Sequence, residues 1–273
     1  MESSRALSEP DTTYRRPIRW RTCSATHQGA VRRLNEDAVL SRADCDHWAV
    51  ADGMGGHEVG DLASQKIVEA LDRLEVPEHL ADAVDCVEDC VLGVNRDLQH
   101  YALSHLDGAT MGSTLVDVVI RGRIGICFWA GDSRLYRYRR QQLNQLTRDH
   151  SQVEDMVQMG LISREEAHGH QCSNVITRAV GVEERLHLDL RLFDVQVGDL
   201  YLLCSDGLHG AVEPDRISEI LDSRDPDICV DELMEAAMEA GAPDNISVVV
   251  IKGEPGRVSA TGRDQTREDN NAS

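Results

Sequence analysis

The stretch Trp48-Ala-Val-Ala-Asp52-Gly-Met-Gly-Gly-His57 joins a short apolar run to an acidic residue and a glycine-rich turn. The run Trp48 to Ala51 has the length of a buried strand, and Asp-Gly is a pair typical of tight turns. The glycines that follow let the backbone turn and let another group approach closely. A carboxylate at the edge of a core needs a partner, because an unpaired charge there is costly. Taken alone, the stretch is also compatible with an ordinary hairpin turn.

The same pattern occurs at three more places in the chain. Asp206 follows the apolar run that starts at Leu200, Asp132 follows Phe128-Trp-Ala-Gly, and Asp244 stands just before the apolar run that starts at Ile246. Four aspartates at strand ends can converge on one edge of a sheet. Ligands that offer only oxygen suit the hard cations Mg²⁺ and Mn²⁺ better than zinc.

Composition excludes several classes of partner. The 273 residues include 28 basic and 48 acidic side chains, for a net charge of −20. Nucleic acid and anionic membrane surfaces are therefore not expected as partners, because both require clustered Lys and Arg. No apolar run approaches 18 residues, and the first 21 residues carry arginines but no apolar core segment, so neither a membrane span nor a secretory signal is predicted.

The eight cysteines contain no Cys-x-x-Cys pair. Cys127 and Cys204 lie inside apolar strands and are interpreted as small core residues. Reduced thiols in a cytoplasmic protein are the expectation for a chain of this length.

The order of predicted elements favours an α+β fold, with helices packed outside antiparallel sheets. Residues 1–20 are predicted to be a disordered extension and 254–273 a disordered tail, so that 21–253 form the domain. Within it, residues 150–180 contain two short helices and a loop, and we interpret them as a surface flap. The remaining strands are predicted at 22–30, 38–40, 113–120, 123–130, 135–138, 143–147, 191–197, 199–204 and 245–252, and the longer helices at 58–74, 79–105, 214–221 and 228–240.

Six short motifs stand in an order that resembles a known family. They are Arg32-x-x-Asn35-Glu36-Asp37, Asp52-Gly-Met-Gly-Gly-His57, Gly112-Ser-Thr114, Gly131-Asp-Ser-Arg134, Ser205-Asp-Gly-Leu208 and Asp244-Asn245. Each motif alone is weak, but together they resemble the PPM (PP2C) family of metal-dependent protein phosphatases in its bacterial form. The resemblance covers roughly residues 20–252, and the segment from Asp149-His150-Ser151 to Arg178-Ala-Val-Gly181 is similar to the family's flap.

The resemblance implies a β-sandwich of two antiparallel sheets flanked by paired helices, with a metal centre at one end. It implies that Asp52 bridges two tightly bound Mn²⁺ or Mg²⁺ ions with the Gly53 carbonyl alongside, and that Asp206 and Asp244 complete the first ion's ligands. Two cations about 4 Å apart can shield an anionic phosphate monoester and activate a water molecule to attack it. The implied reaction is the hydrolysis of phosphoserine and phosphothreonine in proteins.

Three residues near the start of the domain receive supporting roles. Glu36 and Asp37 are expected to hold metal-bound waters, although both residue types are also common helix or turn caps. Arg32 is expected to clamp the phosphate, because a guanidinium fork matches two phosphate oxygens. The adjacent Arg33 competes for this role, and the motif spacing selects Arg32.

Asp132 resembles the family residue that helps to bind a third cation, sharing it with Asp206. Many relatives have a further carboxylate four residues after Asp206, where this chain has Gly210, so a weak third site is expected. Met54 replaces the histidine that is the proposed general acid in some members. The proton for the leaving group must then come from water or another group, and we interpret His57 as a packed or capping residue.

Several other readings of the sequence stay open. His168-x-His170-x-Cys172 could hold zinc but lacks a fourth ligand nearby, whereas a P-loop is excluded because no Gly-Lys-Ser/Thr follows the glycine-rich turn. The chain could be a regulatory binding module on the same fold, which its full set of carboxylates argues against, or a phosphatase for a small phosphoester. The leading interpretation is a cytoplasmic phosphatase whose partners are phosphorylated proteins and the Ser/Thr kinase that it opposes.

Overall fold

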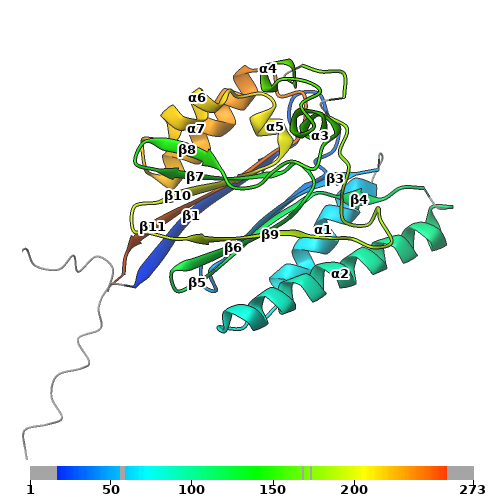
Figure 1. Ribbon diagram of the computed structural model, residues 1–273, viewed down its shortest axis with the longest axis horizontal. Coiled ribbons are helices and arrows are strands. Elements are labelled where there is room, and N and C mark those ends of the chain that lie inside the picture. The colour runs from blue at the N-terminus through cyan, green and yellow to red at the C-terminus, as the bar shows by residue number, and fades with distance from the viewer. Residues whose placement is uncertain (1–16, 56–58, 108, 168, 173, 257–273) are drawn as a thin grey trace, which may run out of the picture.

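Two antiparallel sheets face each other, and helices cover the outer side of each sheet (Figure 1). The computed structural model describes residues 17–55, 59–107, 109–167, 169–172 and 174–256. This arrangement confirms the predicted α+β sandwich with flanking helices.

All strand pairs in both sheets are antiparallel. The first sheet has the order β1-β11-β10-β7-β8, with the bounds β1 (Ile18–His27), β11 (Ile246–Pro255), β10 (Leu200–Cys204), β7 (Arg134–Arg139) and β8 (Gln142–Gln145). The second has the order β2-β3-β5-β6-β9, with β4 paired to β3, and the bounds β2 (Asp37–Arg42), β3 (His47–Met54), β5 (Leu115–Arg121), β6 (Ile124–Ala130), β9 (Asp189–Asp194) and β4 (Gly112–Ser113).

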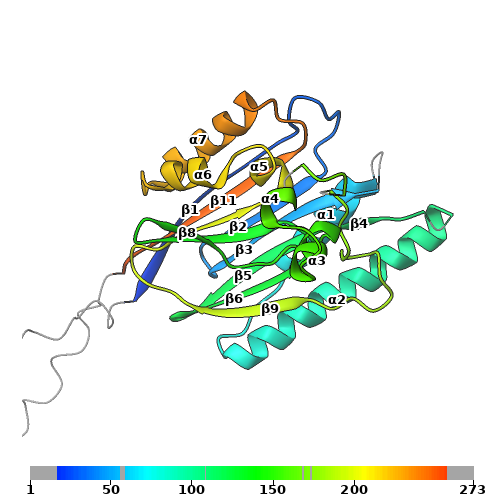
Figure 2. The same ribbon diagram turned by 45° about the horizontal axis from the view of Figure 1, so that its top comes forward.

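The helices divide between the two outer faces and one end of the sandwich. Helices α1 (Val59–Asp72) and α2 (Leu80–His105) lie on the second sheet, and α6 (Pro214–Leu221) and α7 (Pro226–Glu239) lie on the first (Figure 2). The short helices α3 (Gln152–Gln158), α4 (Arg164–Ala167) and α5 (Asp206–His209) gather at one end, opposite the end where β1 begins and β11 finishes.

Strand β10 shows why the central strands are apolar throughout. Tyr201 and Leu203 point into the space between the sheets, where they join Trp48, whereas Leu200 and Leu202 point outward under α6 and α7. A strand covered on both faces cannot alternate apolar with polar residues, so it appears in the sequence as a continuous apolar run.

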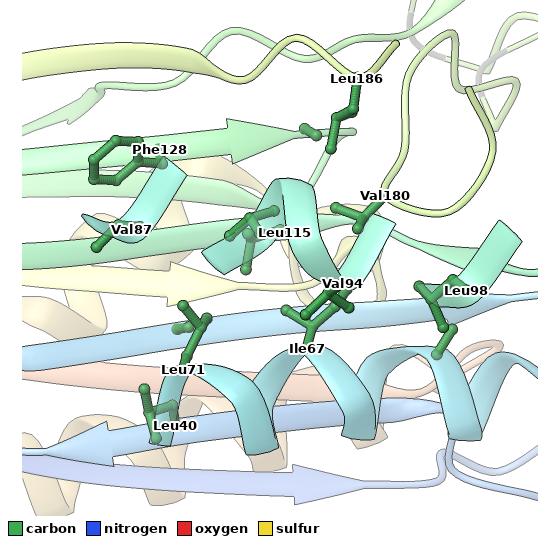
Figure 3. Close-up of a cluster of buried hydrophobic side chains, with 14 of the residues drawn as sticks. Leu40, Ile67, Leu71, Val87, Val94, Leu98, Leu115, Phe128, Val180 and Leu186 are labelled. Carbon is green, nitrogen blue, oxygen red and sulfur yellow. The ribbon is translucent and has the colours of Figure 1, made fainter. Parts of the chain in front are cut away.

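The outer face of the second sheet is sealed by apolar stripes on α1 and α2. Ile67 and Leu71 of α1 and Leu98 of α2 are fully buried, and they belong to the same apolar cluster as Leu115 and Phe128 of the sheet (Figure 3). Ile67 and Leu71 are four residues apart, which places them on one side of α1.

The flap is joined to the second sheet by the bridge between Val180 and Ser113 of β4, and the bridge between Ser151 and Ile176 joins its own two ends. Ser151 caps α3 by accepting a hydrogen bond from the Glu154 backbone N–H at 3.3 Å. The buried Glu154 carboxylate in turn accepts two hydrogen bonds from Arg164, at 2.8 and 3.1 Å. These contacts cap α3 and join it to the start of α4.

The sandwich extends a few residues beyond both ends of the predicted domain, 21–253. Strand β1 begins at Ile18, inside the predicted N-terminal extension, because Trp20 is buried between the sheets with its ring centroid 6.1 Å from that of Trp48. Strand β11 continues to Pro255, which pairs with Ile18. The polar residues around Trp20 concealed its strand in the sequence. Residues 1–16 and 257–273 lie outside the described residues.

Several other bounds differ from the prediction, such as those of β9, which covers Asp189–Asp194 rather than 191–197. Helix α7 begins at Pro226 rather than at residue 228, and the four residues from Asp206 to His209 form a helix that the sequence did not predict. Within the described ranges, no helix is both long and apolar enough to cross a bilayer.

Candidate metal and phosphate site

The predicted acidic residues come from strand ends that meet at one edge of the sandwich. Asp37 begins β2 and pairs in register with Asp52 near the end of β3. Asp206 begins α5 directly after β10, and Asp244 stands two residues before β11. Because neighbouring antiparallel strands begin and end at shared edges, residues far apart in sequence become neighbours here, such as Asp37 and Ser205, which are 168 positions apart.

Burial and mutual repulsion disturb the acidity of these carboxyl groups. Burial raises the pKa of Asp37 to about 7, and the nearby charges of Asp206 and Asp244 add to this effect. Burial raises the pKa of Asp52 well above its usual range, and the negative charges of Asp37 and Asp206 add to it. The carboxylates therefore repel one another, and a cation between them would relieve that repulsion.

Asp206 and Asp132 belong to the same electrostatic cluster. Burial raises the pKa of Asp206 to about 6, and Asp244 contributes to the shift. Burial raises the pKa of Asp132 to about 7, with Asp206 as the next cause. All four predicted carboxylate ligands thus interact with at least one other member of the set.

Three buried oxygen atoms at this edge have no hydrogen-bond partner: Glu36 Oε1, Asp37 Oδ1 and Asp206 Oδ1. A buried oxygen atom without a hydrogen-bond partner destabilises the folded state, so these three atoms indicate a place where a ligand binds. The cluster offers oxygen donors, which fit Mn²⁺ or Mg²⁺.

Among the described residues, no three His, Cys, Asp or Glu side chains lie close enough together to coordinate one metal ion by themselves. A Mg²⁺-like cation does not require such a group, because it keeps several of its waters and takes few protein ligands. The partnerless oxygens and the mutual repulsion fit such a hydrated pair of cations.

Hydrogen bonds fix the backbone around the site. Asn245 Oδ1 accepts from the Glu36 N–H at 2.8 Å, while its Nδ2 donates to the carbonyls of Gln28 and Leu34. The Asp37 carboxylate accepts from Ser205 Oγ at 2.8 Å. These bonds join the segment that carries Arg32 and Glu36 to the strands that carry the other acidic residues.

The Gly112-Ser-Thr114 motif holds Asp52 from the opposite side. The Thr114 N–H donates to the Asp52 carbonyl at 2.8 Å, and Thr114 Oγ1 accepts from the Asp52 N–H at 3.1 Å. Thr114 Oγ1 also lies 2.7 Å from Ser133 Oγ, which links Asp52 to the loop that carries Asp132. The motif is therefore a structural support, a role that the sequence did not reveal.

Arg32 stands at the rim of the cluster with about half of its side chain exposed. Its guanidinium donates to Asp244 Oδ2 at 2.6 Å, and this hydrogen bond raises the pKa of Arg32. The contact places the predicted phosphate clamp directly beside a predicted metal ligand. A phosphate held by the metal centre would then lie within reach of the guanidinium.

Two predicted features cannot be placed completely. His57 lies outside the described residues, while Met54 is half-buried at the end of β3. Of the alternative zinc ligands, His168 also lies outside them, and His170 Nδ1 accepts a hydrogen bond from the Cys172 N–H at 3.2 Å. The zinc interpretation stays untested.

Two histidines were missed by the sequence analysis. His209 closes α5 and its Nε2 lies 3.0 Å from the Asp132 carbonyl oxygen. His150 Nδ1 accepts from the Gly131 N–H at 3.1 Å, and its ring lies parallel to that of Trp129. Desolvation is the main cause that lowers the pKa of both imidazoles, that of His209 to about 3, so both are neutral at pH 7. The only sequence signal was their position beside recognised motifs.

Comparison with known proteins agrees with this arrangement. The family model described as protein phosphatase 2C matches residues 25–243. The chain is 36% identical to the serine/threonine protein phosphatase PstP of Mycobacterium tuberculosis over 84% of this chain and 44% of that protein. It is also 36% identical to the serine/threonine phosphatase stp of Listeria monocytogenes, over 83% of this chain and 93% of that one. The chain thus spans less than half of PstP but nearly all of stp.

Solved structures show the same likeness. PppA, described as a key regulatory component of T6SS in Pseudomonas aeruginosa, superposes with a TM-score of 0.80 at 39% identity, over 87% of this chain and 99% of that one. The catalytic domain of PstP in complex with two manganese ions superposes with a TM-score of 0.79 at 33% identity, over the same shares.

The chain belongs to the protein phosphatase 2C family, the metal-dependent serine/threonine protein phosphatases that its motif order indicated. The manganese-bound relative confirms the predicted type of cofactor, Mn²⁺ or Mg²⁺.

Proposed function

We propose that this chain hydrolyses phosphoserine and phosphothreonine in proteins at the carboxylate cluster of Asp52, Asp206 and Asp244. The observation that supports this most strongly is the set of mutually repelling carboxylates with partnerless oxygens, which come from strand ends of both sheets. Family membership and the two named phosphatase relatives support the same reaction.

When bound, two divalent cations would shield the phosphate charge and make a water molecule a better nucleophile. Asp52 and the Gly53 carbonyl would hold both ions, with Asp206 and Asp244 completing one of them. Glu36 and Asp37 would orient waters around the pair, and the partnerless oxygen of each is available for this.

Arg32 would fix the substrate by its phosphate. Its guanidinium, which donates to Asp244 here, would instead donate to the phosphate, because its fork matches two phosphate oxygens. The water oxygen attacks phosphorus as the bond to the serine or threonine oxygen breaks, and that oxygen needs a proton. Met54 has none to give, so the proton comes from water or from a different side chain.

The relatives also guide the choice of protein substrates. PppA is described as a regulatory component of T6SS, so phosphoproteins of such a system are a reasoned first choice for this chain. A cognate Ser/Thr kinase that makes these phosphoproteins, and a cytoplasmic location shared with it, belong to the same proposal.

Turnover on matched peptides tests the proposal. Phosphate release from phosphothreonine, phosphoserine and phosphotyrosine peptides and from a small aryl phosphate is measured with Mn²⁺ for the wild type and Asp244→Asn. We expect turnover of the first two peptides by the wild type and the loss of most of it in the variant, with an unchanged circular dichroism spectrum. Turnover of the small ester alone would favour the small-molecule alternative, and no turnover at all would favour a binding module.

A further inference from the structure

The loop Gly131-Asp132-Ser133 is held by imidazoles on two sides. His209 Nε2 lies 3.0 Å from the Asp132 carbonyl oxygen. His150 Nδ1 accepts from the Gly131 N–H at 3.1 Å, and the His150 N–H donates to the Gly131 carbonyl at 2.9 Å. The peptide groups before and after the Asp132 Cα atom are therefore both fixed by a histidine.

His209 connects two acidic residues that belong to different segments. It closes α5, the four-residue helix that begins with Asp206, and it reaches across to the β6–β7 loop that contains Asp132. Because a carbonyl oxygen can only accept, the imidazole must carry its proton on Nε2 in this contact. One side chain thus sets the position of the Asp132 backbone relative to the helix of Asp206.

The backbone on both sides of this contact leaves little space for change. Gly131 has a φ of +107°, and a Cβ atom added there would meet Thr114 Cγ2 at 2.6 Å. At Gly210, an added Cβ would lie 2.8 Å from the Asp206 carbonyl oxygen. A further carboxylate at position 210 is therefore disfavoured by the backbone as well as absent from the sequence.

We propose that His209 is a positioning residue that fixes Asp132 relative to Asp206, so that these two carboxylates can bind a weak additional cation without a third carboxylate. This inference rests on the proposed role of Asp132 in the phosphatase site. His150 supports the same loop from the flap side, where Arg178 donates to Asp189 at 2.6 Å and lies 3.1 Å from His150 Nε2. Preorganisation raises the affinity for the cation, because a site with few ligands binds more tightly when those ligands are already held in place.

Calorimetric titration of Mn²⁺ into the metal-free protein tests the inference. The proteins are the wild type, His209→Phe, His209→Gln, Asp132→Ala and the control His47→Gln. His47 is also a buried histidine, but it pairs with Asp117 at 2.7 Å at the far end of β3. Its loss should lower thermal stability without changing Mn²⁺ binding.

We expect His209→Phe to weaken the low-affinity phase about tenfold or more, which is the usual cost of losing a group that orients a metal ligand. His209→Gln should recover part of this loss, because its amide can donate to the same carbonyl. The two tight phases should be unchanged in both variants. In the metal-free protein, hydrogen exchange of the amides at 131–133 should be faster in His209→Phe than in the wild type.

The outcomes separate the inference from the proposal beneath it. If Asp132→Ala removes the weak phase but His209→Phe does not, the positioning role of His209 is wrong and Asp132 keeps its role. If Asp132→Ala leaves the weak phase intact, both roles are wrong, while turnover on phosphopeptides still tests the phosphatase site. If His209→Phe alters the tight phases in the same proportion as the weak one, its effect is a general loss of structure, which also overturns the inference.

Discussion

Asp206→Asn should stabilise the metal-free protein while it abolishes turnover. Burial raises the pKa of Asp206 from 3.8 to about 6, so the folded state binds a proton more readily than the unfolded state does. At pH 7.5 the group is charged in both states, and the folded state carries the full cost of that charge. A pKa shift of this size lowers the free energy of unfolding by about 3 kcal/mol. Because Asp206 keeps some contact with solvent, about 1–3 kcal/mol is a fair expectation.

The sign of this effect fixes its pH dependence. As pH falls below about 6, wild-type Asp206 takes up a proton in the folded state while the unfolded chain stays charged, so the cost shrinks and is fully lost only below the unfolded pKa of 3.8. The stabilities of the wild type and Asp206→Asn should therefore differ most above pH 7, differ by about half as much at pH 5, and converge below pH 4. With Mn²⁺ present the order should reverse, because the wild type gains binding energy that the variant lacks.

Urea unfolding followed by circular dichroism measures this directly, in chelator at pH 7.5 and pH 5 and again with Mn²⁺. In a matching thermal unfolding experiment, the expected gain corresponds to a rise of about 2–12 °C in Tm for a domain of this size. A metal-free variant that is less stable than the wild type at pH 7.5, or a difference that does not shrink at pH 5, would refute the claim that these carboxylates repel one another.

Two further substitutions test individual side chains. Arg32→Ala should lower kcat/KM on a phosphothreonine peptide by about 10- to 100-fold, because a charge-assisted fork on the phosphate is lost, whereas Arg33→Ala should stay close to the wild type; equal losses in both variants would contradict the choice of Arg32. Burial raises the pKa of the Cys204 thiol to about 12, so it is not a thiolate at neutral pH and cannot be the nucleophile. Cys204→Ala should therefore turn over substrate at close to the wild-type rate despite a stability loss on the order of 1 kcal/mol, and an inactive variant that still folds and binds Mn²⁺ would overturn this.

The sequence predicted antiparallel sheets with outer helices and the convergence of the acidic residues for a physical reason, whereas the two-sheet sandwich was implied by the family resemblance. An apolar run that stops at an aspartate marks a strand end, and antiparallel strands place such ends on shared edges. Asp37 and Asp52 pair in register, and the charge of Asp244 helps to raise the pKa of Asp206, as that reasoning requires.

What the sequence could not show depends on contacts between distant backbones. The bond from His209 to the Asp132 carbonyl joins residues 77 positions apart, and no side-chain pattern reports on a carbonyl acceptor. The pairing of Arg32 with Asp244 likewise depends on how two loops meet. Trp20 was missed because the residues beside it are polar, although its burial decides where β1 begins.

The metal dependence of turnover tests the central claim most directly. The protein is stripped with chelator and desalted, and phosphate release from a phosphothreonine peptide is then measured with and without added Mn²⁺. The carboxylate cluster predicts negligible turnover in the stripped protein and recovery on adding Mn²⁺, with no recovery in Asp52→Asn. Full turnover by the stripped protein would contradict a metal-dependent reaction at this site.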